Sequence, residues 1–222
     1  MGTLVLNFKS HQEVLGDGAV KLARIAESVS HMTNTDIILA PPAPFLALVA
    51  SKTSCKVYAQ SIDQKPSSRV GRNITAQMAA AAGARGAMLN HSDFRIHARL
   101  IESAALEVRN AGLELLLCSE TTQEAGRLAK ARPTYLVIED KQLIGSGVSI
   151  TSANPNLISD SLKAARAAGF KGRFLSGAGI REAKDVETAI SLGADGVLVS
   201  SAVIKSADWR AKLLELSRPL GG

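Results

Sequence analysis

Three residues of complementary chemistry each follow a short apolar stretch of the sequence: Lys9, His91 and Glu139. An amine, an imidazole and a carboxylate are groups that enzymes combine for acid–base catalysis. Each residue alone has an ordinary structural explanation: a solvated lysine, a histidine satisfied by the backbone at a helix start, and an acid before a turn. Their shared position after apolar runs favours a common site.

Glu139 ends the most informative stretch. Residues 135–138 form an apolar run bounded by Pro133, which predicts a buried strand. Gly145 and Gly147 follow within a few residues. A carboxylate at the tip of a buried parallel strand, followed by a mobile glycine loop, is suited to hold a base and to close a lid over it. We therefore predict a base at Glu139 and a lid over 140–147.

The elements that must position these groups alternate along the whole chain. Helix-like segments are predicted at 18–31, 43–51, 74–83, 96–111, 121–131, 155–168, 182–193 and 208–217. Apolar runs that predict strands lie at 4–6, 37–40, 56–59, 87–89, 113–117, 135–138, 173–175 and 196–199. Eight strand–helix units predict a single (β/α)₈ barrel domain over residues 1–222. The alternative, an open doubly wound sheet, predicts a GxGxxG after an early strand, and the sequence contains none there.

In such a barrel the carboxyl ends of the strands meet on one face, where the chemistry belongs. Small-residue loops follow two further strands on that face, at 176–179 and at 200–201. Lys9, His91 and Glu139 are therefore expected to face one another, with these loops beside them.

Composition narrows the class of protein. Hydrophobic residues make up 46% of the 222 residues, which is enough for a substantial core. The net charge is +6, and the basic residues are scattered without a basic run, which argues against nucleic acid as a partner. No apolar run approaches the roughly 20 residues that span a membrane, and the N-terminus lacks the pattern of a signal peptide. We expect a cytoplasmic protein in which Cys55 and Cys118, each placed within a predicted strand, are free thiols.

The sequence resembles the triosephosphate isomerase family from Asn7 to about Asp208, and its compact archaeal branch in particular. The spacing from Glu139 to Ile144-Gly145 matches the base and lid of that family. The motifs that carry the resemblance are Asn7-Phe8-Lys9, Ala40-Pro41-Pro42, Ala59-Gln60, Asn90-His91-Ser92, Glu139 with Ile144-Gly145-Ser146-Gly147, and Ser176-Gly177-Ala178-Gly179.

The resemblance implies an isomerase that interconverts dihydroxyacetone phosphate and glyceraldehyde 3-phosphate. Glu139 would move the proton, and neutral His91, kept uncharged by a helix starting at 92, would polarise the carbonyl. Lys9, oriented by Asn7, would stabilise the negative charge, and Asp93 would support the site. Substrate-binding residues would be Asn7, Phe8, Lys9, Ile144, Gly145, Gly179, Ser200 and Ser201. No metal or organic cofactor is implied, and His91, Asp93 and His97 do not share one helical face as metal ligands would.

Departures from the family pattern leave two other functions open. Asp93-Phe94 stand where the family has Glu-Arg, Asp140 replaces the proline that starts the lid, and Val70 replaces a threonine. A barrel acting on a four-carbon sugar phosphate, or a weakly catalytic barrel that binds a phosphorylated ligand, remains an alternative.

The segment 61–73 is long for a strand–helix connection, so it is either functional or disordered. The family resemblance implies that it inserts beside Asn7 and Lys9 of a second subunit, with Val70 at its tip. A homodimer or homotetramer is therefore expected.

Overall fold

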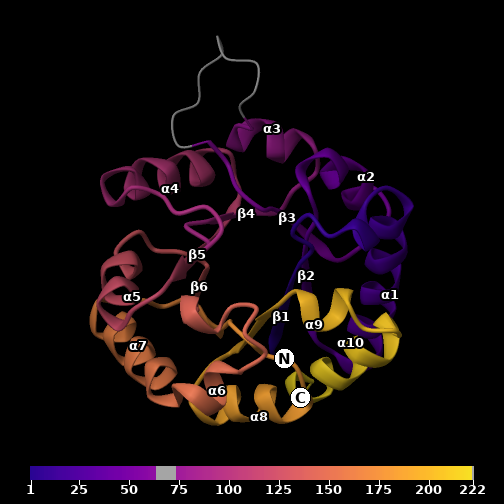
Figure 1. The fold of residues 1–222 in the computed structure, drawn as a ribbon. Coiled ribbons are helices and arrows are strands. Elements are labelled where there is room, and N and C mark those ends of the chain that lie inside the picture. The colour runs from indigo at the N-terminus through magenta and orange to yellow at the C-terminus, as the bar shows by residue number, and fades with distance from the viewer. Residues whose placement is uncertain (64–73, 222) are drawn as a thin grey trace.

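The computed structural model describes residues 1–63 and 74–221, which form a closed barrel of eight parallel strands in sequence order (Figure 1). Strand β1 pairs with both β2 and β8, which closes the sheet. This confirms the predicted (β/α)₈ barrel. The strands are β1 Thr3–Asn7, β2 Asp36–Ala40, β3 Lys56–Ala59, β4 Gly86–Leu89, β5 Glu114–Ser119, β6 Tyr135–Ile138, β7 Arg173–Ser176 and β8 Gly196–Val199.

Helices form a ring outside the strands (Figure 1). The α-helices are α1 Asp17–Thr33, α2 Leu46–Ala50, α3 Ala76–Ala81, α4 Ile101–Asn110, α5 Thr122–Ala129, α6 Ile150–Ala153, α7 Pro155–Ala167, α8 Ala183–Ser191, α9 Ser201–Ile204 and α10 Trp209–Ser217. Short 3₁₀ turns are η1 Gln12–Val14, η2 Ala43–Phe45, η3 Ala98–Leu100, η4 Lys141–Leu143 and η5 Arg218–Leu220.

The core has two layers because alternate residues of a strand point to opposite faces. In β1, Val5 belongs to the barrel interior, whereas Leu4 and Leu6 pack toward the helices. Strand residues are buried on both faces, so the strands read as continuous apolar runs, and this explains why sequence alone located all eight.

Two local predictions are wrong. The segment 96–111 is not one helix, because α4 begins only at Ile101 after the 3₁₀ turn η3. Cys55 precedes β3 and is only partly buried, although it and Cys118 are both free thiols as expected.

Candidate active site

Glu139 stands immediately after β6, and its backbone N–H donates to Ser119 O at 2.9 Å. The side chain is 4% exposed. Its Oε1 lies 3.5 Å from His91 Nε2, and its Oε2 has no hydrogen-bond partner among the described residues. A buried carboxylate oxygen without a hydrogen-bond partner is costly, and it is available to accept a proton from a ligand.

His91 follows β4 and is turned inward by Asn90, whose φ of 63° lies in the left-handed region. The ring is buried, and its Nδ1 accepts a hydrogen bond from the backbone N–H of Asp93 at 3.2 Å. The proton of a neutral ring therefore belongs on Nε2, which faces Glu139. This is the tautomer that can donate a hydrogen bond to a ligand oxygen.

The expected cause of a neutral His91 is wrong. No α-helix starts at 92, since residues 92–94 form a turn and a bend, residues 95–97 are irregular, and α4 begins at Ile101. Burial lowers the pKa of His91, but the hydrogen bond to Glu139 and the charges of Glu139 and Asp93 outweigh it, so the pKa lies above its ordinary value. A ligand that separates the two side chains removes the largest of these raising effects.

Lys9 is held in a left-handed conformation, with φ of 49°, directly after β1. Its backbone N–H donates to Asn7 Oδ1 at 3.0 Å, and Gln60 Nε2 donates to the carbonyl oxygens of Lys9 at 3.0 Å and Ala40 at 2.9 Å. These bonds from neighbouring strand ends fix the backbone from which the amine extends. Asn7 thus contacts the backbone of Lys9, and its role in orienting the amine stays a prediction.

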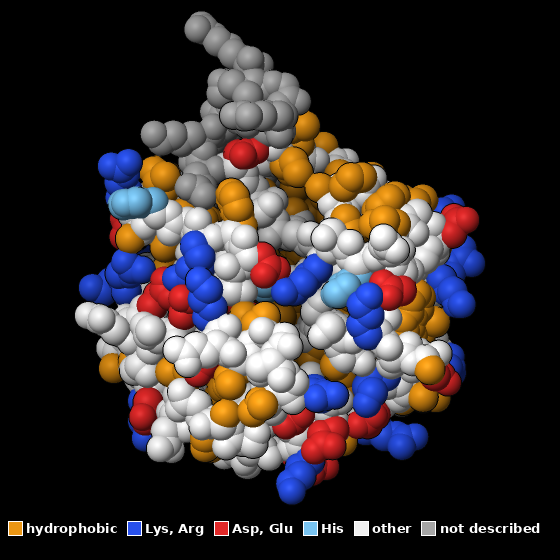
Figure 2. All heavy atoms as spheres, viewed as in Figure 1, with side chains coloured by type: hydrophobic (Ala, Val, Ile, Leu, Met, Phe, Trp, Pro, Cys, Tyr) orange, Lys and Arg blue, Asp and Glu red, His pale blue; other side chains and the backbone are white. Residues whose placement is uncertain are grey.

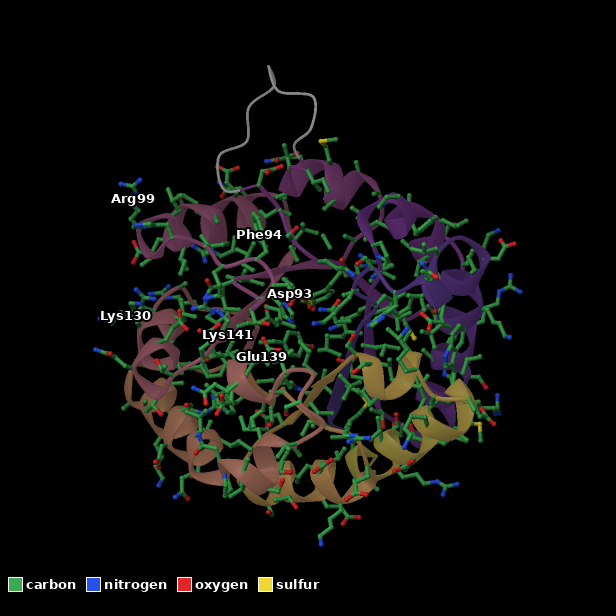
Figure 3. All side chains as sticks on the ribbon, in the orientation of Figure 1. Asp93, Phe94, Arg99, Lys130, Glu139 and Lys141 are labelled. Atoms are coloured by element: carbon green, nitrogen blue, oxygen red, sulfur yellow. The ribbon has the colours of Figure 1, made fainter. Side chains whose placement is uncertain are left out.

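Asp93 joins the amine to the imidazole. Its Oδ2 lies 3.0 Å from Lys9 Nζ and 3.4 Å from His91 Nδ1. Figure 3 places Asp93 and Glu139 near the middle of the ring of helices, and Arg99 and Lys130 at its outer edge. Asp93, which stands where the family has glutamate, therefore contacts both the Lys9 amine and the His91 ring.

A cavity of about 500 Å³ opens at this end of the barrel. Charged side chains of both signs gather round the centre of the face shown in Figure 2. Eight of the predicted residues line the cavity: Lys9, His91, Glu139, Ile144, Gly145, Gly179, Ser200 and Ser201. Asn7 and Phe8 do not; the side chain of Phe8 lies in the hydrophobic core, and its contact with substrate stays a prediction.

Three further basic residues line the same cavity and were missed: His11, Arg181 and Lys205. Lys205 Nζ lies 2.6 Å from Glu13 Oε1, and Arg181 Nη1 donates to Gly147 O at 2.9 Å. Burial and the positive charges of Lys205 and Lys9 hold the pKa of His11 below its ordinary value. Arg181 directly follows the glycine loop in sequence, but nothing in that spacing fixes the direction of a long side chain.

The lid region begins with Asp140, whose Oδ1 accepts from the backbone N–H of Gln142 at 3.0 Å and so caps η4. Gly145 and Gly147 have positive φ values, as a tight glycine loop requires. Val70 and most of the segment 61–73 lie outside the described residues.

Within residues 1–63 and 74–221, no cluster of three or more His, Cys, Asp or Glu side chains is arranged to hold a metal ion. In the same ranges, no helix is long and apolar enough to cross a membrane.

The fold and the site define the class: a (β/α)₈ barrel whose cavity, at the carboxyl ends of the strands, is lined by a lysine, a histidine and a glutamate. The sequence model of the triosephosphate isomerase family matches residues 3–216. Triosephosphate isomerase from Caldivirga maquilingensis is 38% identical over 220 residues, which cover 99% of this chain and 97% of the relative. The enzymes of that name from Archaeoglobus fulgidus and Methanocaldococcus jannaschii are 36% and 33% identical, covering 97% and 96% of this chain and 97% of each relative.

The chain belongs to the triosephosphate isomerase family. These relatives are archaeal, which agrees with the resemblance to the compact archaeal branch. Membership supports isomerisation of a phosphorylated triose.

Proposed function

We propose that this protein interconverts dihydroxyacetone phosphate and D-glyceraldehyde 3-phosphate through an enediolate, with Glu139 as the base and His91 as the electrophile. One observation carries the assignment of roles. A buried carboxylate with a free oxygen faces the Nε2 of a histidine whose other nitrogen already accepts a hydrogen bond. A carbonyl compound bound between them would meet a proton acceptor and a hydrogen-bond donor together.

In the forward reaction Glu139 removes a proton from the CH₂OH carbon of dihydroxyacetone phosphate. The electron pair moves to the carbonyl oxygen, which receives a hydrogen bond from His91 Nε2–H. Transfer of a proton between the two oxygens and return of the carboxyl proton to the neighbouring carbon give the aldehyde. The Lys9 ammonium stabilises the negative charge that develops.

The phosphate group is assigned to the part of the cavity lined by Gly145, Gly179, Ser200 and Ser201. Glycine backbones allow an anion to approach N–H groups closely. Lid 140–147 would cover the intermediate and exclude water, which suppresses loss of phosphate. The proposed steps use no metal ion and no organic cofactor.

The test is a coupled assay with D-glyceraldehyde 3-phosphate and, separately, with erythrulose phosphates. The proposal predicts a higher kcat/KM for the triose. Faster turnover of the four-carbon ketose would favour a tetrose phosphate isomerase. Phosphate ligands that bind without any turnover would favour a phospholigand-binding barrel.

Assembly and location complete the proposal. We expect at least a homodimer in the cytoplasm, with the segment 61–73 beside the partner's site as the family resemblance implies. Light scattering at micromolar protein should give a mass of at least two chains. A fully active monomer would refute this assembly.

A further inference from the structure

The two ends of the lid 140–147 are attached differently. At the first end, Asp140 makes exposed contacts with the N–H of Gln142 at 3.0 Å and with Asn154 Nδ2, between α6 and α7, at 3.3 Å. At the second end, hydrogen bonds join the chain to the loop that follows β7. The second end is thus tied to a different part of the barrel.

Backbone contacts form the first tie. The N–H of Ile150 donates to Ala178 O at 3.1 Å. Gly179 packs so closely against the chain leaving the lid that a Cβ atom there would lie 1.9 Å from Val148 O. The loop after β7 and the second end of the lid therefore fit together only because position 179 is glycine.

A buried carboxylate forms the second tie. Asp185, in the first turn of α8, accepts from Thr151 Oγ1 at 2.8 Å through Oδ1. Its Oδ2 accepts from the backbone N–H groups of Arg181 at 2.8 Å and Glu182 at 3.2 Å. One carboxylate thus holds the chain after the lid and the chain after β7 in a fixed relation.

Arg181 forms the third tie, and it alone reaches the lid itself. Its Nη1 donates to the carbonyl oxygen of Gly147 at 2.9 Å, and its side chain lines the cavity. This bond connects the two segments that carry Gly145 and Gly179. Gly145 lines the cavity from the lid, and Gly179 lines it from the loop after β7. Their relative position is what a phosphate held by both backbones would require.

We propose that Arg181 is a positioning residue that fastens the Gly147 end of the lid to the loop after β7, with Asp185 as the buried anchor, so that the lid moves from its Asp140 end. The effect of this fastening on turnover rests on the proposed function. The fastening itself is a property of the free protein and is tested without substrate.

The first experiment is hydrogen exchange on the free protein. Arg181→Met should raise the exchange rates of the amides at 145–149 by about fivefold or more, because local opening no longer breaks the bond to Gly147. Arg24→Met, which removes an exposed arginine on α1, is the matched control and should leave these rates unchanged. Thr151→Val, which removes one bond to Asp185, should raise exchange at 149–152. Unchanged exchange at 145–149 in Arg181→Met would overturn the proposal.

The second experiment is kinetic. Arg181→Met should lower kcat by about tenfold and raise the fraction of turnovers that release inorganic phosphate, since a looser lid admits water to the intermediate. Arg181→Lys keeps the positive charge and a hydrogen-bond donor. It should therefore restore part of the lost kcat and reduce the release of inorganic phosphate. A rise in KM alone, with normal kcat and normal phosphate release, would mean that Arg181 only attracts the anion, and would overturn the positioning role. If Glu139→Gln retains activity while exchange still responds to Arg181→Met, the proposed base is wrong and the fastening stands.

Discussion

The two ends of the barrel use polar groups in opposite ways. At the amino ends of the strands, Lys56 Nζ lies 3.1 Å from Glu114 Oε1 and 3.9 Å from Asp36 Oδ2. The hydroxyl of Tyr58 donates to Glu114, and that of Tyr135 donates to Asp36 at 3.3 Å. Burial and the neighbouring Glu114 raise the pKa of Tyr58, so the hydroxyl keeps its proton. The charges and hydroxyls of these five residues are satisfied by one another.

At the carboxyl ends, several buried oxygens have no hydrogen-bond partner in the part of the chain that the structure describes. They are Ser92 Oγ, Glu120 Oε1, Glu139 Oε2, Ser176 Oγ and Ser200 Oγ. A satisfied network contributes to the stability of the fold, whereas unpaired buried groups cost stability and are available to a ligand. The comparison therefore assigns stability to the amino end and function to the carboxyl end, and the variants below test that division.

The largest expected effect is at the carboxyl end. Glu139→Gln should lower kcat by at least ~10³-fold, because the amide cannot accept the proton. Its unfolding temperature should not fall, because a buried carboxylate with an unsatisfied oxygen is replaced by a neutral group of the same shape. Wild-type turnover in this variant would show that Glu139 is not the base.

Gly177→Ala should lower kcat by about 100-fold through displacement of Glu139. A Cβ at position 177 would lie 2.8 Å from Glu139 Cγ and 3.2 Å from Oε1, so the carboxylate must move. Gly126→Ala in α5 is the control, since its Cβ would meet nothing closer than 3.5 Å. Steady-state kinetics and a crystal structure of the variant would check the displacement, and equal kcat values for both variants would contradict it.

A smaller effect concerns pH. The Glu139 carboxylate raises the pKa of His91, so Glu139→Gln should lower the pKa that NMR measures for the His91 ring, and Asp93→Asn should lower it less. In the free enzyme, kcat/KM should fall as pH decreases through the His91 pKa, because a protonated ring pairs with the carboxylate that must act as base. An unchanged His91 pKa in Glu139→Gln would rule out this pairing.

The smallest kinetic effect is expected at the amino end. Tyr58→Phe removes the hydroxyl that donates to Glu114 and should cost about 1 kcal/mol of unfolding free energy in urea, with kcat unchanged. Tyr135→Phe, which loses a longer bond to Asp36, should cost less. A loss of kcat without loss of stability would break the division between the two ends.

How far the sequence predicts this molecule depends on the range of the interactions involved. The strands are predictable because both of their faces are buried, and Glu139 is predictable because it stands where such a strand ends. The break before α4 is not, because the apolar periodicity continues through the 3₁₀ turn η3. Helices α6 and α9, four residues each, are too short to show a period.

Contacts between distant residues account for most of what the sequence does not predict. Lys56 and Glu114 are 58 residues apart, and Arg181 meets Gly147 across 34. Each of these two contacts depends on the register of the barrel and on the direction of flexible side chains. A local sequence pattern predicts neither. The raised pKa of His91 was missed for the same reason, since it follows from the approach of Glu139, which lies on another strand end.

Proton transfer by Glu139 is tested most directly by isomerisation in D₂O. With dihydroxyacetone phosphate as substrate, NMR of the glyceraldehyde 3-phosphate formed by the wild-type protein should show deuterium at the carbon next to the aldehyde, because the carboxyl proton exchanges with solvent in the intermediate state. Glu139→Gln should bind the substrate yet show neither product nor deuterium incorporation into the ketose. Product formed by Glu139→Gln at the wild-type rate, with deuterium still entering at that carbon, would contradict Glu139 as the base.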